Sequence, residues 1–334
     1  MRTSLYLSCF KNLVLRPPPV TVFVNLLKYV ANQRLLRRVA ISYYPISLII
    51  YLTKRCNYSC TFCYAQNVLD SKNWASDLTL DQLRKILASP YGRKALRIGF
   101  LGGEPFMNPR VFELIDEVKS HRKVMTLVTN ASLLNEAKLT RLLQTRLDVL
   151  GVSLYENNRR HVERVVRTLD GKMTYWVQTV VTAQDLKTME STLEFAVSIG
   201  CRHLLFGNCV PMTSEDRHLV IYDDNQEYLS LEARLKAQFR GKISVSWVQL
   251  VRRQSGKRAC AMPSSYLMVD NDGGMGACCV RAPDSSRYGN IYSDANAWNL
   301  PYYLRLRESM LDPSIEPIDV CRDCDNLHQD LYRI

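Results

Sequence analysis

The chain has 334 residues, more than one core of ordinary size takes up, which favours a large α/β domain or such a domain with a smaller appendage. Apolar residues make up 47% of the chain and charged residues 23%, values that exclude a disordered or collagen-like protein. The longest apolar run, 46–52, is far shorter than the roughly 18 to 20 residues that span a bilayer.

The formal net charge of +12 arises mostly in the N-terminal region. The first acidic residue is Asp70, and nine Lys or Arg residues precede it, which leaves 35 basic against 32 acidic residues in the rest of the chain. The first residues do not read as a secretion signal, because a basic residue interrupts their apolar stretch and no small-residue cleavage site follows. We therefore expect a cytoplasmic protein whose eleven cysteines are reduced thiols or metal ligands.

Residues 1–45 form a basic N-terminal extension in which 22–39 are expected to be an amphipathic helix. Its apolar side chains (Phe23, Leu26, Leu27, Val30 and Val39) are set against basic ones (Lys28, Arg34, Arg37 and Arg38). Such a helix covers the open end or edge of a sheet, contacts an anionic membrane surface or lipid-linked substrate, or docks a peptide or phosphorylated substrate. A nucleic-acid partner is not expected, because no recognisable binding module accompanies the basic composition.

Residues 46–245 alternate β-branched runs with amphipathic helices, the pattern of βα units and a parallel sheet. The predicted strands are 46–52, 96–101, 124–129, 148–154, 175–182 and 203–207. Predicted helices include 80–88, which opens with the capping box Thr79-x-x-Gln82, and 111–119. Six units are two short of a closed eightfold barrel, so the sequence predicts an open, partial (β/α)6 barrel.

Residues 246–334 form a second, smaller domain with short strands, Gly-rich turns and clustered cysteines. The segments 265–270 and 275–279, separated by Asn271-Asp272-Gly273-Gly274, predict a β-hairpin. A helix is expected near 299–310.

Three cysteines, Cys56, Cys60 and Cys63, lie in the loop after the first predicted strand, where barrel active sites are found. Three thiolates at this spacing can bind one face of a cubane cluster and leave its fourth iron open for a non-protein ligand. The alternatives are a zinc knuckle, for which no fourth Cys or His lies nearby, and three unrelated buried thiols.

With Phe62 at the aromatic position, this C-x3-C-x-aromatic-C segment resembles the radical S-adenosylmethionine (radical SAM) enzymes. Gly102-Gly103-Glu104 after the second strand is similar to the family motif that holds the methionyl amino group of the cofactor. Two glycines permit close backbone approach, and the Glu104 carboxylate can accept hydrogen bonds from an ammonium. The alternative is a turn with no other role.

The resemblance also implies that Asn130 and Ser153 face the ribose and carboxylate of the cofactor, with ordinary capping of strand ends as the alternative. Gln178 is a further candidate if it faces inward on the fifth strand. Related enzymes usually read Ser-Leu-Asp-Gly where this chain has Ser153-Leu154-Tyr155-Glu156, so this loop is expected to serve a different substrate.

The C-terminal cysteines Cys260, Cys278, Cys321 and Cys324 suit a fully ligated [4Fe–4S] cluster, with zinc as the alternative. This segment resembles the auxiliary-cluster domain called SPASM in its long form and twitch in its short form. Cys279 adjoins Cys278 and points to the opposite face of the strand, so one of the two is expected to bind, and we choose Cys278. No cysteine follows Cys324, so we expect one auxiliary cluster.

The resemblance implies an enzyme that binds a [4Fe–4S] cluster and S-adenosylmethionine, generates a 5′-deoxyadenosyl radical and abstracts hydrogen from a substrate. We expect a net two-electron oxidation of a small polar, lipid or sugar-type molecule, with a flavodoxin or ferredoxin as reducing partner. Only 45 residues precede the first strand, fewer than a peptide-binding leader domain needs.

Two alternatives remain within this enzyme class. One is a peptide-modifying enzyme. The other is an epimerase in which Cys209 returns a hydrogen atom, although Cys209 also suits the role of a small buried apolar residue. Outside this class, a non-catalytic iron–sulfur electron-transfer protein does not explain a three-ligand cluster beside Gly-Gly-Glu.

Overall fold

The structure is a computed structural model that describes residues 16–63, 65, 69–70, 72–211, 215–252, 258, 260–276, 278, 283–322 and 324. Within these residues the strands form one nine-stranded sheet in the order β7-β6-β5-β4-β3-β2-β1-β8-β9. The strands are β1 (Ser47–Thr53), β2 (Arg97–Gly102), β3 (Val124–Thr129), β4 (Val149–Ser153), β5 (Tyr175–Val181), β6 (His203–Asn208), β7 (Ser244–Ser246), β8 (Tyr266–Val269) and β9 (Met275–Gly276).

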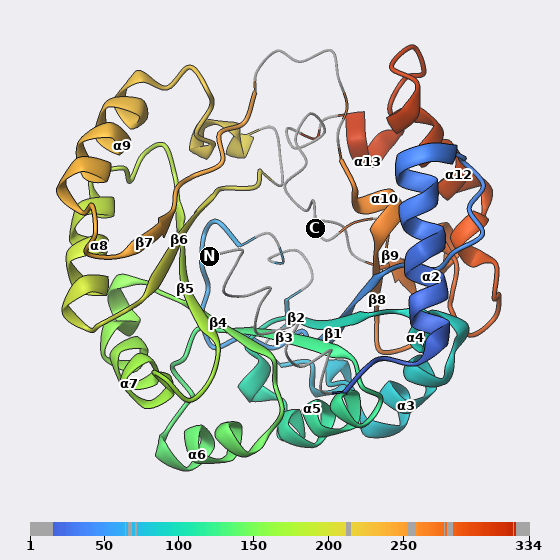
Figure 1. Ribbon diagram of the computed structural model, residues 1–334, viewed down its shortest axis with the longest axis horizontal. Coiled ribbons are helices and arrows are strands. Elements are labelled where there is room, and N and C mark those ends of the chain that lie inside the picture. Colours follow the sequence, from blue (N-terminus) through green and yellow to red (C-terminus); the bar gives the residue numbers. More distant parts are fainter. Residues whose placement is uncertain are drawn as a thin grey trace.

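The sheet curves into an open, partial barrel with helices on its outer side (Figure 1). Strands β1 to β7 are all parallel to their neighbours, which confirms the predicted βα rhythm. Alternate residues of each strand point to the helices, as Leu48, Ile50 and Leu52 of β1 show by being completely buried. All six predicted barrel strands are present, with ends that differ by at most one residue.

The helices on the outer side are α3 (Leu80–Ala88), α4 (Pro90–Lys94), α5 (Val111–Ser120), α6 (Glu136–Gln144), α7 (Arg159–Leu169), α8 (Thr188–Ser198) and α9 (Gln226–Gln238). The predicted capping box of α3 is confirmed. The Gln82 N–H donates to the Thr79 hydroxyl at 3.2 Å, and the Thr79 N–H donates to the Gln82 side-chain oxygen at 2.9 Å.

The C-terminal segment continues the barrel sheet, which the sequence did not predict. Strand β8 pairs in parallel with β1, from Ser47 opposite Tyr266 to Ile50 opposite Val269. Strand β9 pairs antiparallel with β8, which confirms the predicted hairpin. The remaining C-terminal helices are α10 (Met262–Ser265), α11 (Ser285–Tyr288), α12 (Pro301–Leu311) and α13 (Asp319–Arg322).

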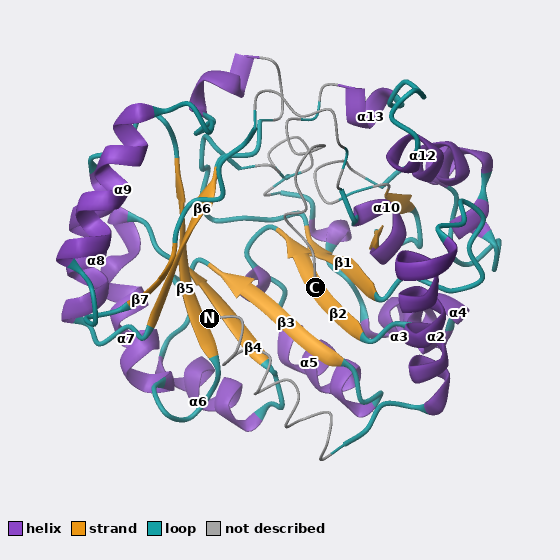
Figure 2. Ribbon diagram, turned by 45° about the horizontal axis from the view of Figure 1, so that its top comes forward, coloured by secondary structure: helices purple, strands orange, loops and turns teal. Residues whose placement is uncertain are grey.

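The N-terminal extension forms α2 (Val20–Ala31), which runs into a π-helical turn (Asn32–Leu36). Helix α2 lies beside α4, on the outer side of the barrel (Figure 2). Its contact there is polar, because the buried Asn25 side chain donates to the carbonyls of Tyr44 and Lys94 at 3.0 and 3.2 Å.

Arg307 of α12 joins the N-terminal and C-terminal segments. Its buried guanidinium donates to the backbone carbonyls of Val39, Pro263 and Trp298. Burial lowers the pKa of Arg307 to about 10, which still leaves the side chain charged at neutral pH. The extension is therefore fixed to the same core as the C-terminal region.

Candidate active site

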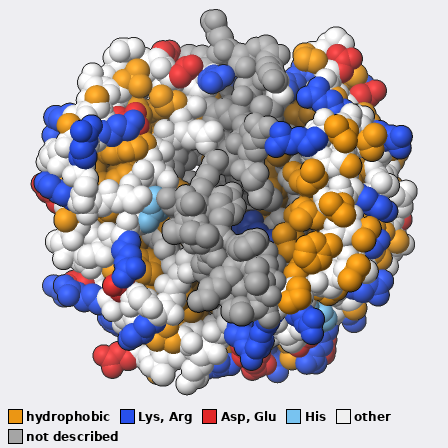
Figure 3. Space-filling view, in the orientation of Figure 1, with side chains coloured by type: hydrophobic (Ala, Val, Ile, Leu, Met, Phe, Trp, Pro, Cys, Tyr) orange, Lys and Arg blue, Asp and Glu red, His pale blue; other side chains and the backbone are white. Residues whose placement is uncertain are grey.

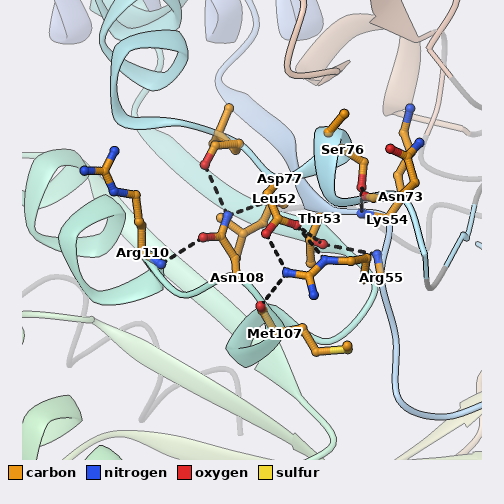
Figure 4. Close-up of polar contacts among 12 residues, drawn as sticks. Leu52, Thr53, Lys54, Arg55, Asn73, Ser76, Asp77, Met107, Asn108 and Arg110 are labelled. Atoms are coloured by element: carbon orange, nitrogen blue, oxygen red, sulfur yellow. Dashed lines mark hydrogen bonds and ion pairs between the residues drawn. The ribbon is translucent and has the colours of Figure 1, made fainter.

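The loop that carries the first three cysteines is anchored by a buried ion pair just before Cys56 (Figure 4). The Arg55 guanidinium donates to both carboxylate oxygens of Asp77, at 3.1 and 2.5 Å, and to the Met107 carbonyl at 2.6 Å. The Thr53 hydroxyl also donates to Asp77, at 2.6 Å. These contacts hold the end of β1 in one position at the start of the cysteine loop.

A second set of contacts joins this loop to its neighbours (Figure 4). The Asn108 amide donates to the carbonyls of Leu52 and Leu78, both at 3.1 Å. The Lys54 N–H donates to the Ser76 hydroxyl at 3.0 Å. The Lys54 ammonium pairs with Asp270 at 2.7 Å, so the cysteine loop is tied to the end of β8 as well.

The three cysteines of the loop are all partly exposed. The Cys63 N–H donates to the Cys60 carbonyl at 3.2 Å, which closes a turn. Burial raises the pKa of the Cys60 thiol to about 11, and Cys63 and Cys56 make smaller contributions in the same direction. In the part of the chain that the structure describes, no group of three or more His, Cys, Asp or Glu side chains is gathered closely enough for a single metal ion.

The Gly-Gly-Glu turn after β2 lies directly against the cysteine loop. The N–H groups of Gly103 and Glu104 donate to the carbonyls of Thr53 and Arg55, at 2.8 and 2.9 Å. A Cβ atom on Gly103 would lie 1.8 Å from the Arg55 carbonyl oxygen, so this approach requires glycine.

The Glu104 carboxylate is 2% exposed and accepts three hydrogen bonds. Its donors are the Thr129 hydroxyl at 2.6 Å, the Asn130 N–H at 2.8 Å and the Phe106 N–H at 3.2 Å. Burial raises the pKa of Glu104, and these hydrogen bonds oppose that effect. A carboxylate offers about four acceptor sites, so Glu104 can accept one more donor.

Asn130 links the loop after β3 to the cysteine loop. Its amide donates to the Asn57 side-chain oxygen at 3.0 Å, and its own oxygen accepts from the Ser132 hydroxyl at 2.6 Å. Asn57 in turn donates to Ser132 at 2.8 Å. These contacts hold the loop after β3 against the cysteine loop, and cofactor contact by Asn130 stays a prediction.

Ser153, the last residue of β4, lies opposite Gln178 in the middle of β5. Ser153 is buried, and Gln178 is partly exposed and accepts a hydrogen bond from the Trp176 indole N–H at 2.7 Å. On β5 the buried Val177 and Val181 face the helices, so Trp176 and Gln178 lie on the inner face, as predicted for Gln178.

Tyr155 is a site residue whose position the sequence did not predict. Its ring lies 5.7 Å from the ring of Phe62 and 6.5 Å from that of Tyr58, both in the cysteine loop. Burial raises the pKa of its hydroxyl, and so does the nearby Cys60, while a hydrogen bond with Ser153 lowers it. The departure from Ser-Leu-Asp-Gly noted above was the signal that could have identified this contact.

Cys209 follows β6 and is buried. Burial raises the pKa of its thiol to about 11. The adjoining Asn208 side chain donates to the carbonyls of Ile221 and Gln249 at 2.8 and 3.1 Å, which fixes this loop. A role for Cys209 as hydrogen donor stays a prediction.

The four C-terminal cysteines are partly exposed. Cys260 precedes α10, Cys278 follows β9, and Cys321 and Cys324 lie in and after α13. Two residues before Cys260, the Arg258 guanidinium donates to four carbonyls at the end of α12 and in the segment that follows it, those of Ser309, Asp312, Pro313 and Ile315. These hydrogen bonds join the segment before Cys260 to the segment before Cys321. Cys279 lies outside the described residues, so the choice of Cys278 over Cys279 stays a prediction.

Two family descriptions match the chain in the order that the motifs predict. The radical SAM superfamily matches residues 50–215, from β1 past β6. The chain belongs to the radical SAM superfamily. The iron–sulfur cluster-binding domain SPASM matches residues 260–325, the region of the second cysteine set. The predicted fold class, enzyme class and resemblance are thereby confirmed.

Three known proteins illustrate this similarity. A tungsten-containing aldehyde ferredoxin oxidoreductase cofactor-modifying protein from Pyrococcus furiosus is 25% identical over 198 residues, 53% of this chain and 55% of that protein. The PqqA peptide cyclase of Gluconobacter oxydans is 31% identical over 121 residues, 36% of this chain and 33% of that protein. The chain thus spans about half the length of the first of these proteins and a third of the second.

Among solved structures, Streptococcus suis SuiB bound to its precursor peptide SuiA superposes with a TM-score of 0.65 at 17% identity. The superposition covers 92% of this chain and 76% of SuiB. At this identity the likeness establishes a common fold of the radical SAM barrel and C-terminal domain.

Proposed function

We propose that this radical SAM enzyme modifies a peptide. Two similar proteins support this substrate class, since one is named for cyclising the peptide PqqA and the other was crystallised with a precursor peptide. The sequence favoured a small-molecule substrate, and these two named proteins favour the peptide alternative instead.

The observation that carries the proposal is that the Gly-Gly-Glu turn, with its buried Glu104 carboxylate, lies directly against the loop of the three cysteines. Cys56, Cys60 and Cys63 would bind three irons of a [4Fe–4S] cluster, and the unused acceptor site of Glu104 would receive the ammonium of S-adenosylmethionine. When bound, the cluster supplies the electron that cleaves S-adenosylmethionine into methionine and a 5′-deoxyadenosyl radical. Phe62, Tyr58 and Tyr155 would exclude water from this position.

The substrate would lie against the inner face of the sheet next to Tyr155. Trp176, Gln178 and Val180 on the inner face of β5 are partly exposed, as is Leu205 on β6, whereas Val177 and Val181 on the other face of β5 are buried. A closed barrel fills this space with side chains, and the open sheet leaves it accessible. We assign substrate contact to this face of β5 and β6.

We further propose that Cys260, Cys278, Cys321 and Cys324 hold one auxiliary [4Fe–4S] cluster. Anaerobically reconstituted protein would then contain roughly eight irons, and a variant lacking all four thiols would contain half as many. Replacing Cys278 alone should lose the auxiliary cluster, and replacing Cys279 alone should retain it. The opposite result would assign Cys279 as the ligand.

A second candidate substrate is a small molecule or cofactor, which the name of the Pyrococcus furiosus relative favours. The two candidates differ in what stimulates cofactor cleavage. The holoenzyme is incubated anaerobically with S-adenosylmethionine and a reduced flavodoxin or ferredoxin, and 5′-deoxyadenosine is measured with and without peptides encoded beside the gene.

Peptide modification predicts faster 5′-deoxyadenosine formation and a changed peptide mass. A Cys56→Ala, Cys60→Ala, Cys63→Ala variant should lose both signals and about half its iron. Cofactor cleavage by that variant would refute the assignment of the three thiols. Neighbouring peptides that stay unchanged, while a small molecule is converted, would refute the peptide proposal alone.

The product mass separates the possible reactions. Transfer of the substrate electron to the auxiliary cluster gives a product two hydrogens lighter. Return of a hydrogen atom by Cys209 leaves the mass unchanged in water and adds one deuterium in deuterated water, because a thiol exchanges its proton with solvent. We propose oxidation. Epimerisation would be assigned instead if the wild-type enzyme gave deuterium-labelled product and Cys209→Ala stopped turnover.

A further inference from the structure

Helix α2 turns its apolar side toward solvent. Val20, Phe23, Val24, Leu27 and Val30 recur at helical spacing and are all exposed, with Leu27 at 69%. Leu35 and Leu36 in the following π-helical turn extend this face, with Leu35 at 80%. We call the seven side chains the α2 apolar face. Of the described residues, two other large hydrophobic side chains are comparably exposed, Tyr292 and Leu311.

The opposite side of the same helix is buried and contains Val22 and Asn25. Asn25 binds the backbone of Tyr44 in both directions, since its oxygen accepts from the Tyr44 N–H at 2.7 Å. Asn32 does the same with Arg38, at 3.1 and 3.2 Å. Rotating the helix to bury its apolar face would break these hydrogen bonds and expose buried acceptors, so the outward orientation is fixed.

Basic side chains border the α2 apolar face. Lys28, Arg34, Arg37 and Arg38 are all exposed, and no acidic residue occurs before Asp70. Lys94 of α4 lies next to this group, since its pKa is lowered by burial and also by the charges of Lys28 and Arg93. Figure 3 shows the hydrophobic side chains gathered over α2, with Lys and Arg side chains beside them.

We propose that the α2 apolar face docks on the surface of an anionic lipid bilayer. An exposed apolar stripe flanked by basic residues fits the boundary between acyl chains and negatively charged headgroups. A two-fold dimer through the same face would bring the basic borders of two copies together, which like-charge repulsion opposes. None of the described helices is long and apolar enough to cross a membrane.

Sedimentation with lipid vesicles tests this proposal. The holoprotein is mixed with vesicles of phosphatidylcholine alone or with about one-third phosphatidylglycerol, at about 0.1 M salt. We expect at least tenfold tighter binding to the anionic vesicles and weaker binding at higher salt. Leu27→Glu should lower the affinity by at least tenfold, and Leu311→Glu, an exposed leucine on α12, should not.

Charge variants provide an independent measurement. Lys28→Gln and Arg34→Gln should each weaken binding to anionic vesicles by about fivefold while leaving binding to neutral vesicles unchanged. Equal binding to both vesicle types, or unchanged binding of Leu27→Glu, would overturn the proposal. So would a wild-type dimer that Leu27→Glu converts to monomers, because the face would then join two copies. S-adenosylmethionine binding by each variant, measured separately, keeps this test independent of the proposed function.

Discussion

Replacing Asp77 by Asn removes the charge that the buried Arg55 guanidinium faces at the start of the cysteine loop. The side chain of Arg55 is 1% exposed and that of Asp77 is 15% exposed. Because Asn has nearly the same shape as Asp, the variant removes the negative charge and one acceptor oxygen while leaving the packing unchanged. It leaves a buried cation without its carboxylate partner.

The expected loss of stability follows from this burial. Breaking a buried ion pair typically costs 3–5 kcal/mol, and the slight exposure of Asp77 places the loss at about 3 kcal/mol. Unfolding entropy is about 2.1 cal/mol/K per residue, or roughly 0.7 kcal/mol/K for a chain of this length, so the Tm should fall by about 4 °C. The first cluster should also become less occupied, since the Arg55 contacts position Cys56.

Anaerobic differential scanning fluorimetry and iron analysis would measure both effects. Glu163→Gln is the matched control, because Glu163 pairs with Arg167 at 2.8 Å on the exposed side of α7. An exposed pair of this kind contributes less than about 1 kcal/mol, so the control should shift the Tm by about 1 °C or less. Equal shifts in the two variants, or full iron content in Asp77→Asn at a lowered Tm, would refute the reasoning.

Three further predictions concern other parts of the molecule. Glu104→Gln should weaken S-adenosylmethionine binding by tenfold or more with unchanged iron content; equilibrium dialysis would measure it, and unchanged affinity would leave the Gly-Gly-Glu turn only a structural role. Arg258→Ala should lose the auxiliary cluster because four carbonyls lose their donor, whereas Arg305→Ala, at an exposed pair, should keep all its iron. Burial lowers the pKa of His203 to about 4, so between pH 6.5 and 4 the unfolded chain binds the extra proton. Stability to urea should therefore fall by about 2 kcal/mol from pH 7 to pH 5, and His203→Gln should abolish that share.

The sequence predicted the features that local patterns encode. The strands of the barrel are short β-branched runs separated by amphipathic helices, and alternation along the fifth strand placed Gln178 on its inner face. The first cysteine set and the Gly-Gly-Glu turn each lie within a few residues of one strand end. Because the strands are parallel, their carboxyl ends had to meet at one edge.

The features that the sequence did not predict depend on contacts between distant segments. The pattern of residues 22–39 predicted an amphipathic helix, and the two buried asparagines that decide which side faces inward have partners up to 69 residues away. Arg258 donates to backbone carbonyls more than 50 residues further along the chain. Every residue has a backbone carbonyl, so the sequence could not indicate which ones Arg258 contacts. Tyr155 reaches the cysteine loop across the mouth of the barrel.

The pairing of β8 with β1 also constrains the order in which the chain can fold. Ser47 of β1 can pair with Tyr266 of β8 only after about 220 further residues have been synthesised. At about 5 to 20 residues per second, one edge of β1 stays bare on the ribosome for roughly 10 to 45 s. That edge presents the unpaired backbone groups of a hydrophobic strand, which favour wrong pairing. A barrel expressed without the residues after 245 would keep this edge for its whole lifetime, so we expect it to aggregate rather than to act as an independent domain.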